Sequence, residues 1–398
     1  MAEAKYARVS QCTVCGSTDL RECVRIDAMP VYCNVLWPTA ETAKNARRGD
    51  IDLVFCGQCG HVFNRVFDPG LMDYTEGYEN SLHFSGRFNE YAGSLARRLV
   101  DQYGIRGKDV IELGCGKGDF LAMVCAAGHN RGTGFDRSYE FERDGGASSR
   151  HLTFFQDYYS EKYAHLPADL ICCRHVLEHI QFPGDLLGTL SRALERRPEA
   201  LLYFEVPNAL YTLEDLGIWD LIYEHCSYFT PTSLERLFSD HGFEIRALDS
   251  AFGGQFLYVE ATRGARRQTP PAVARHPVDE VAADVSAFGK KYRSKVAEWT
   301  SALKAWQTEN RRAVVWGAGS KGVTFLNVLN GVGDISHVVD VNPHKRGRFV
   351  PGTSQEVVGP EFLRVYRPDR VVVMNAIYLE EIRGMLRELG VDAEVDAV

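Results

Sequence analysis

The chain has 398 residues, of which 45% are hydrophobic and 25% are charged. At roughly 150 residues per domain, this length predicts two to three folding units and excludes a single small module. The 45 Lys and Arg residues against 53 Asp and Glu residues give a net charge of −8, which argues against a broad basic surface for nucleic acid. We therefore expect small-molecule or protein partners and no nucleic acid.

Membrane contact and secretion are not expected either. No apolar run approaches the roughly 18 residues that a membrane span needs, and residues 1–11 lack the basic-then-apolar layout of a signal peptide. We therefore predict a cytoplasmic protein. In that compartment the 11 cysteines should be reduced thiols, so a regularly spaced subset is expected to hold metal.

Four cysteines form two CxxCG knuckles near the start of the chain. Cys12 and Cys15 make the first knuckle, and Cys56 and Cys59 make the second. Two residues between thiolates allow a tight turn to aim both sulfurs at one ion, and four such ligands close a tetrahedron around Zn²⁺. The pattern predicts a structural zinc site, with four unrelated buried thiols as the alternative.

The middle of the chain has the pattern of a parallel sheet covered by helices. A helix is expected over residues 80–104, because apolar residues recur there every three or four positions. Apolar runs then alternate with amphipathic or loop stretches, as in α/β folds. The strands predicted from these runs span residues 109–113, 132–135, 169–173, 200–206 and 255–261.

A stretch with three prolines, residues 263–277, separates this region from a second α/β pattern. It has no apolar period, so we expect a linker. Residues 278–306 then predict a long amphipathic helix. The elements expected after it are a strand at 313–316, a glycine-rich turn at 317–322, a helix at 324–329, and strands at 337–341 and 370–375.

A glycine-rich turn follows the strand predicted at 109–113. Glycines there let the backbone approach a ligand closely, and the helix after them offers unpaired amides. Asp136 ends the next strand, where a carboxylate can bind ribose hydroxyls; a turn needed only for packing is the alternative. The motif resembles the first motif of class I S-adenosylmethionine-dependent methyltransferases. That resemblance implies a cofactor site at Glu112, Gly114, Cys115, Gly116, Gly118, Asp136 and Asp157, with Asp157 near the adenine ring.

Arg174, His175 and His179 directly follow the strand predicted at 169–173. The carboxyl ends of strands in open α/β sheets face the ligand. We therefore predict that Arg174 and His175 line the cofactor site and that His179 acts in catalysis. One of the two histidines is expected to be structural, and the sequence does not separate them.

A polar and aromatic run contains Tyr223, Glu224 and His225. A carboxylate beside an imidazole could orient it and raise its basicity. Because adjacent residues point apart on a strand, the alternative is that Glu224 acts separately on substrate or structure. A helix end with a buried aromatic residue is the simplest alternative.

The motifs occur in an order that resembles one family over nearly the whole chain. The two knuckles, the methyltransferase motif, residues 223–229 and residues 317–322 together resemble the three-domain nucleotide-sugar C-methyltransferases, and residues 78–85 and 339–353 add to the likeness. The resemblance implies an α/β fold with three domains. These are a zinc-binding domain (1–75), a class I methyltransferase core with a doubly wound sheet (76–265), and a long helix plus Rossmann-like domain (266–398).

The resemblance also implies the reaction. The family transfers a methyl group from S-adenosylmethionine to carbon 3, or in some relatives carbon 5, of a thymidine-diphosphate 4-keto-deoxysugar. His225 would remove a proton next to the ketone, and His179, with Tyr74 or Tyr78, would hydrogen-bond the enolate oxygen. Because neutral imidazole is the base, activity should fall as pH drops through the histidine pKa, ordinarily about 6.5. The predicted catalytic set is His225, Glu224, His179, Tyr223, Tyr78 and Tyr74.

One position departs from the family pattern. Ile222-Tyr223-Glu224-His225 stands where relatives commonly show Tyr-His-Glu-His, so the family tyrosine is either lost or shifted by one residue. The Glu-His core of the motif is intact, and the catalytic prediction stays there.

The last domain carries a GxGxxG turn at 317–322, and Asp340 ends the following strand. This is a dinucleotide fingerprint, but Lys321 inside the loop and the non-redox family favour a role in binding the phosphates of a sugar nucleotide. A pure scaffold is the alternative. The predicted substrate-binding residues are Asn80, His83, Phe84, Asn208, Lys321 and Asn342.

Two other functions compete with C-methylation. Methyl transfer to oxygen or nitrogen would need no enolate. A zinc-ribbon nucleic-acid-binding protein or RNA methyltransferase is disfavoured by the net charge of −8. The expected ligands are therefore S-adenosylmethionine, structural zinc and a nucleotide sugar. The sequence is silent on oligomeric state, and a monomer is compatible with it.

Overall fold

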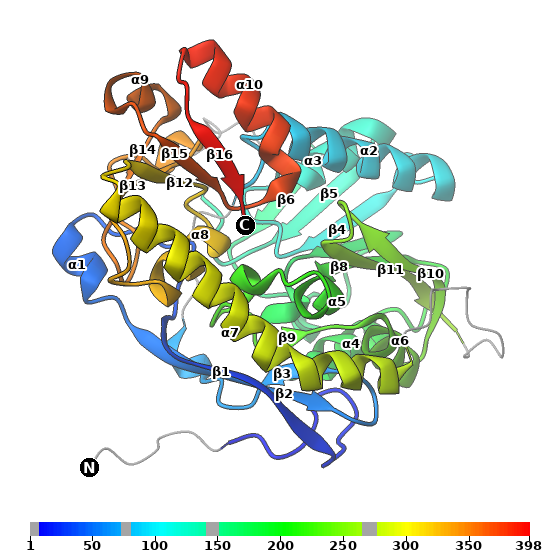
Figure 1. The fold of residues 1–398 in the computed structure, drawn as a ribbon. Coiled ribbons are helices and arrows are strands. Elements are labelled where there is room, and N and C mark those ends of the chain that lie inside the picture. Colours follow the sequence, from blue (N-terminus) through cyan, green and yellow to red (C-terminus); the bar gives the residue numbers. More distant parts are fainter. Residues whose placement is uncertain (1–7, 73–80, 141–150, 265–276) are drawn as a thin grey trace.

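The computed structural model describes residues 8–72, 81–140, 151–264 and 277–398, which form three β-sheets (Figure 1). Tyr74, Tyr78 and Asn80 lie outside the described residues. The proposed boundaries near 75 and 265 also adjoin or fall in such segments, so the division into three domains stays a prediction. No described helix has the length and apolarity that a membrane crossing demands.

An antiparallel sheet follows the first cysteine knuckle, in the order β1-β2-β3-β9. Its fourth strand comes from the middle of the chain, directly after Glu224 and His225. Tyr228 of that strand pairs with Val62, and Ser227 pairs with Phe63. The sheet therefore holds a segment that the sequence assigns to another domain. The elements are β1 (Leu20–Pro30), α1 (Ala40–Lys44), β2 (Arg48–Cys56), β3 (Val62–Asn64) and β9 (Ser227–Tyr228).

The central sheet has seven strands in the order β10-β11-β8-β7-β4-β5-β6. Five strands are parallel, and β10 and β11 are antiparallel additions at one edge. Apolar residues fill both faces of β4, as buried parallel strands require. The strands are β4 (Asp109–Leu113), β5 (Arg131–Phe135), β6 (Leu152–Phe155), β7 (Leu170–Arg174), β8 (Leu201–Pro207), β10 (Phe243–Ala251) and β11 (Phe256–Arg263).

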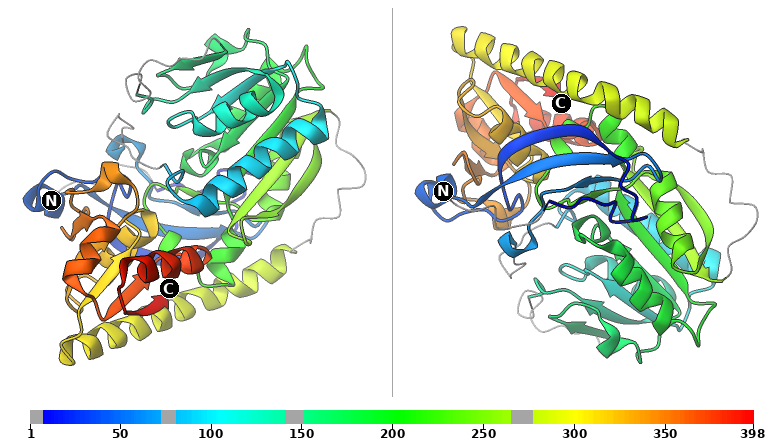
Figure 2. Two further views of the ribbon diagram at one scale, coloured as in Figure 1. Left: turned by 90° about the horizontal axis from the view of Figure 1, so that it is seen from above. Right: turned by 90° about the horizontal axis from the view of Figure 1, so that it is seen from below.

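Helices cover both faces of this sheet (Figure 2). The helix predicted from residue 80 begins later, because Ser85 caps it by accepting a hydrogen bond from the Phe88 amide. The predicted strands agree with β4, β5, β7, β8 and β11, whereas β6 and β10 were not predicted. The helices are α2 (Gly86–Tyr103), α3 (Asp119–Gly128), α4 (Pro183–Ala193), α5 (Ala209–Leu213) and α6 (Pro231–Asp240).

The last part of the chain forms a parallel sheet in the order β14-β13-β12-β15-β16 behind a long helix, α7 (Val278–Thr308). The long amphipathic helix and the following α/β pattern are confirmed. The glycine-rich turn is shorter than predicted, because the helix after it begins at Ser320. The elements are β12 (Ala313–Trp316), α8 (Ser320–Val328), β13 (Ile335–Val339), β14 (Glu356–Val358), α9 (Leu363–Tyr366), β15 (Arg370–Val373), α10 (Leu379–Leu389) and β16 (Glu394–Ala397).

One apolar core joins the first and the last sheet through α5, α7 and α8. Helix α7 packs along β1 and α5, as Figures 1 and 2 show. Its Phe288 is fully buried in a cluster that also contains Trp219 and Phe325 of α8. Phe325 contacts Trp219 and Trp299 at ring-centroid distances of 4.9 and 5.2 Å. Burial of such large aromatic side chains favours a fixed arrangement of the parts.

Candidate active site

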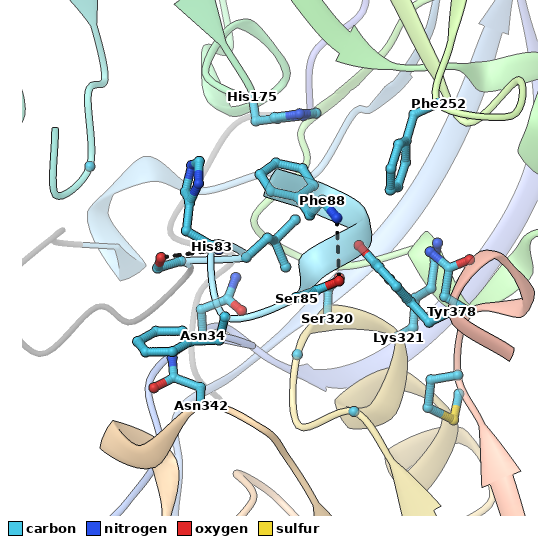
Figure 3. Close-up of a pocket in the computed structure, with 18 of the residues that line it drawn as sticks. Asn34, His83, Ser85, Phe88, His175, Phe252, Ser320, Lys321, Asn342 and Tyr378 are labelled. Atoms are coloured by element: carbon cyan, nitrogen blue, oxygen red, sulfur yellow. Dashed lines mark hydrogen bonds between the residues drawn. The ribbon is translucent and has the colours of Figure 1, made fainter. Parts of the chain in front are cut away.

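A cavity of about 370 Å³ lies where the carboxyl ends of two parallel sheets face each other. Loops after β4, β7 and β8 form one wall, and loops after β12, β13 and β15 form the other. The chain before α2 contributes His83 and Phe84, helix α2 contributes Phe88, and the loop between β1 and α1 contributes Asn34 (Figure 3). This volume is within the range of small-molecule sites.

The glycine loop after β4 lines this cavity. Gly114, Gly116 and Gly118 have φ values of 65°, 55° and 87°, which favour glycine. A Cβ atom on Gly114 would lie 2.1 Å from Val176 Cγ2, so no side chain fits there. Cys115 also lines the cavity. The loop thus brings bare backbone to the cavity at the start of α3, as a nucleoside cofactor requires.

Two acids predicted to contact the cofactor are engaged within the protein. Asp136 Oδ2 accepts a hydrogen bond from the Gly116 amide at 2.8 Å, and Oδ1 accepts one from the Ser138 amide at 2.7 Å. Asp157 accepts a hydrogen bond from the Tyr163 hydroxyl at 2.7 Å. Asp136 therefore shapes the glycine loop itself. Its ribose contact and the adenine contact of Asp157 stay predictions.

Arg174 reaches the cavity wall but is paired with a fully buried carboxylate. Its guanidinium lies 2.8 Å from Glu205 Oε1, and the hydroxyls of Tyr91 and Tyr203 donate to Oε2. Burial opposes ionisation of Glu205, but the charge of Arg174 and these hydrogen bonds hold its pKa below the usual range. His175 Nε2 lies 3.1 Å from the same Oε1. Arg174 and His175 thus share one counter-ion.

Two further buried carboxylates, Glu112 and Glu178, line the cavity. Burial raises the pKa of Glu112 to about 8, because a charge is poorly solvated there. Glu178 is 1% exposed, and both of its carboxylate oxygens lack a hydrogen-bond partner within the described ranges. Near neutral pH the Glu112 carboxyl is therefore mostly protonated and can donate a hydrogen bond as well as accept one, whereas the Glu178 carboxylate lies 3.7 Å from His175.

His175 has an unusual backbone conformation and lies between Glu178 and Glu205. Its φ of 55° is rare for a residue with a side chain, and such strain is concentrated at functional sites. Burial lowers its pKa, but hydrogen bonding and charge from Glu178 and Glu205 outweigh burial and raise the pKa to about 9. His175 is therefore cationic near neutral pH.

His179 and His225 line the same cavity and lie edge to face, with ring centroids 4.9 Å apart. Burial lowers the pKa of His179 to about 4 and that of His225 to about 3. Both imidazoles are neutral at physiological pH. The loss of activity expected as pH drops through the pKa of His225 should therefore come well below pH 6.5, because burial disfavours the charged ring.

The tautomer of His179 also changes its predicted role. Its Nδ1 lies 3.0 Å from the carbonyl oxygen of Glu224, and a carbonyl only accepts, so Nδ1 carries the proton. In the neutral ring, Nε2 is then a proton acceptor. With Nδ1 protonated, Nε2 has no proton to donate, so the predicted hydrogen bond from His179 to an enolate oxygen requires a different protonation state and stays a prediction.

Two residues of the predicted catalytic set point elsewhere. Glu224 is fully buried, and its Oε1 accepts a hydrogen bond from the Cys33 amide at 3.1 Å. The Tyr223 hydroxyl accepts a hydrogen bond from the Asp68 amide at 2.9 Å. Neither side chain lines the cavity, so these contacts favour structural roles, and the catalytic roles of Tyr223 and Glu224 stay predictions. The backbone bends between them and His225, which alone of the three enters the cavity.

The opposite wall carries the second glycine loop and Lys321. The Lys321 ammonium lies 3.1 Å from Asp220 and donates to Gln255 Oε1 at 2.9 Å. Gln255 and Asn375 exchange a pair of amide hydrogen bonds, of 3.0 and 2.8 Å. Lys321 therefore lines the cavity while bridging two units (Figure 3). The Gln255–Asn375 pair had no sequence signal.

Asp340 does not present a free carboxylate for a ribose. Its Oδ2 accepts hydrogen bonds from the Ala318 amide at 2.9 Å and from Lys345 at 3.4 Å. Asn342 Oδ1 accepts from the His344 amide, whereas its buried Nδ2 lacks a partner in the part of the chain that the structure describes. Asn342 lines the cavity, so its amide nitrogen is available to a ligand.

Of the remaining predicted substrate residues, two line the cavity and one does not. His83 and Phe84 line the cavity, and Phe84 packs near His344 at a ring-centroid distance of 5.8 Å. Asn208 does not line it; its side chain caps α5 and donates to the Gly254 carbonyl at 2.9 Å. Its substrate role is therefore corrected to a structural one. Glu178 and Asn34 were missed, although Glu178 lies inside the predicted histidine cluster.

The two cysteine knuckles meet in space. The Sγ atoms of Cys12 and Cys59 are 3.6 Å apart, as are those of Cys15 and Cys56, and all four lie within 4.8 Å of one another. Tetrahedral ligands at a Zn–S length of about 2.3 Å lie about 3.8 Å apart. The thiols thus have the arrangement that zinc requires.

Comparisons with known proteins agree with this site. Residues 84–248 match a family model described as a methyltransferase domain, and residues 250–392 match a C-methyltransferase C-terminal domain. The fold and cavity define a class I S-adenosylmethionine-dependent methyltransferase. The C-methyltransferase NovU of Streptomyces niveus is 26% identical over 391 residues, covering 94% of this chain and 91% of NovU. The chain is thus similar to C-methyltransferases over both matched regions.

Solved structures resemble only part of the chain. Human N-acetylserotonin methyltransferase matches 45% of this chain and 53% of its own, with 17% identity and a TM-score of 0.36. Magnesium protoporphyrin IX methyltransferase from Synechocystis PCC 6803 matches 45% of this chain and 84% of its own, with 20% identity and a TM-score of 0.34.

Gly114→Ala should weaken S-adenosylhomocysteine binding by at least about tenfold, which corresponds to roughly 1.4 kcal/mol. The added Cβ collides with Val176 and distorts the loop at the cavity. Isothermal titration calorimetry measures this affinity. Gly107→Ala is the matched control, because Gly107 has a similar φ of 63° with no atom within 4 Å of its Cβ position. Equal affinities in the two variants would contradict the assignment.

Proposed function

We propose that this C-methyltransferase methylates carbon 3 of a nucleotide-linked 4-keto-deoxysugar, of the thymidine-diphosphate type, through an enolate. The observation that carries the proposal is the pair of neutral imidazoles, His179 and His225. Both line the same cavity as the glycine loop after β4. Carbon acids need a base before they accept a methyl group, whereas transfer to oxygen or nitrogen needs no enolate.

His225 removes the proton next to the ketone. Its ring is neutral and reaches the cavity, and its Nδ1 lacks a hydrogen-bond partner among the described residues. The resulting imidazolium needs nearby negative charge, since it forms in a buried place. The Glu178 carboxylate would supply it, because its ligand atom lies within 4.8 Å of that of His225, and the acceptor nitrogen of His179 could accept a hydrogen bond. Tyr74 and Tyr78 remain the proposed donors to the enolate oxygen.

The glycine loop after β4, with Cys115 and the neighbouring Glu112, would hold S-adenosylmethionine. When bound, this cofactor supplies an electrophilic methyl group on a sulfonium sulfur. Arg174 and His175 keep the wall rigid through Glu205.

The second glycine loop would bind the nucleotide part of the substrate. Helix α8 begins in the cavity wall at Ser320, and its amino end attracts phosphate. Asn342 adds a buried amide donor. Every Lys and Arg on the described lining is paired with a carboxylate, so we expect backbone and amide donors to make most of these contacts.

The substrate assignment predicts transfer to a nucleotide-linked 4-ketosugar carrying deuterium at carbon 3. The product should gain one methyl group and lose one deuterium, because the carbon exchanges its hydrogen for methyl. Mass spectrometry after incubation of the whole protein with S-adenosylmethionine and a panel of such sugars measures both changes. Methyl gain with all deuterium retained would indicate transfer to oxygen or nitrogen. No transfer to any of the sugars would reject the substrate class.

His225→Ala should slow solvent deuterium exchange at the reacting carbon by about 100-fold or more, because the general base is lost. Exchange is followed by NMR in heavy water with S-adenosylhomocysteine in place of the methyl donor. The control is His241→Ala, since His241 lies outside the cavity and bonds the Leu237 carbonyl at 2.8 Å. Undiminished exchange in His225→Ala would remove this residue from the base role.

We also propose that the four knuckle cysteines hold structural Zn²⁺. Four thiolates complete the coordination sphere and leave no open position for substrate, so the ion would act by fixing the sheet. Structural zinc of this kind contributes directly to folding.

Zinc content should be one ion per chain after dialysis against a weak chelator, and Cys15→Ser should remove most of it. The lost thiolate breaks the tetrahedron and lowers the melting temperature. Atomic emission and differential scanning calorimetry measure the two effects. Cys23→Ser is the control, because Cys23 lies on the same sheet but outside the cluster. The same zinc content in both variants would count against the site.

A further inference from the structure

Glu178, His179 and His225 form a second group with the donors of a metal site. One ligand atom from each lies within 4.8 Å of the other two, and all three residues line the cavity. Two imidazoles and one carboxylate are a common ligand set for zinc and related divalent ions. The remaining positions would open toward the cavity.

Glu178 is the strongest sign that this group attracts a cation. Its side chain is 1% exposed, and neither carboxylate oxygen has a hydrogen-bond partner in the described chain. An unpaired buried carboxylate costs several kcal/mol. The nearest cation, His175, lies 3.7 Å away and also serves Glu205. Glu205 also pairs with Arg174, so Glu178 has His175 as its cation, but at 3.7 Å and without a direct hydrogen bond to either carboxylate oxygen among the described residues.

The histidines are arranged as metal ligands commonly are. His179 donates its Nδ1 proton to the Glu224 carbonyl, which leaves Nε2 as the acceptor. Ligating histidines almost always donate their other ring nitrogen in this way. His225 is held against it at a ring-centroid distance of 4.9 Å, and its Nδ1 is one of the buried atoms without a partner in the described ranges.

We propose that Glu178, His179 and His225 bind a divalent transition-metal ion, such as Zn²⁺, which reversibly inhibits methyl transfer. The ion takes the lone pairs that would otherwise receive and stabilise the substrate proton. Metal binding stands on the ligand geometry alone, whereas inhibition rests on the proposed function of His225. No bond to substrate forms or breaks in this step, since the ion and the proton compete for the same atoms.

Cobalt tests the site in protein that already carries zinc on the cysteine knuckles. We expect one equivalent of Co²⁺ to bind and give visible ligand-field bands without a thiolate charge-transfer band. That spectrum separates nitrogen and oxygen ligands from cysteine ligands. Absence of a bound second ion in calorimetry and absorption would overturn the site, as would a spectrum with thiolate charge transfer alone.

Substitutions of the proposed ligands test whether Co²⁺ binds at this group. Glu178→Gln and His225→Ala should each weaken Co²⁺ binding by at least about tenfold, because loss of even an outer contact typically costs that much. Glu381→Gln is the matched control, since Glu381 lines the same cavity but bonds Ser85 and is not in the group. S-adenosylhomocysteine affinity checks that each variant folds. Unchanged Co²⁺ affinity in both site variants would overturn the assignment.

Measurements of methyl transfer distinguish the proposed metal site from the proposed ketosugar methylation. Added Zn²⁺ should suppress both methyl transfer and solvent exchange in the zinc-loaded enzyme, and a chelator should restore them. Co²⁺ binding without methylation of any ketosugar would support the metal site while rejecting the substrate class. Methylation that continues with the second site filled would overturn the inhibition.

Discussion

The pairing of β3 with β9 is the contact on which the position of the proposed base depends. The Asn64 amide donates to the Cys226 carbonyl at 2.9 Å, one residue beyond His225. On the other side of β9, the Thr230 hydroxyl donates to the Gly60 carbonyl at 3.1 Å. Gly60 directly follows the second cysteine knuckle. The amino-terminal sheet therefore fixes the backbone of a segment that enters the cavity of the methyltransferase core.

The cavity combines ionisable groups whose surroundings drive their pKa values apart. His175 lies between two carboxylates and is cationic, whereas burial lowers the pKa values of His179 and His225 and keeps both rings neutral although Glu178 is near them. Glu178 serves both environments, because it approaches His175 on one side and the two neutral rings on the other. One buried carboxylate thus links the cofactor wall to the proposed site of proton removal.

Local patterns predicted the parts of this molecule that depend on local chemistry. Buried strands such as β4 and the left-handed glycines after it follow from apolar runs and glycine spacing. The directions of Tyr223 and Glu224 did not follow, because they are set by contacts with Asp68 and Cys33, far away in sequence. The pairing of Lys321 with Asp220 could not be predicted either, because these residues are also far apart in sequence.

The bridge formed by Lys321, Gln255 and Asn375 differs in kind from the aromatic core around Phe325. Each hydrogen bond in the bridge contributes only about 1 kcal/mol net, since water replaces it when the partners separate. Water does not replace the contacts of the apolar core in this way, because exposing apolar surface to water is unfavourable. A ligand as large as a nucleotide would therefore enter and leave where the polar bridge parts, with the end held by α7 acting as the pivot.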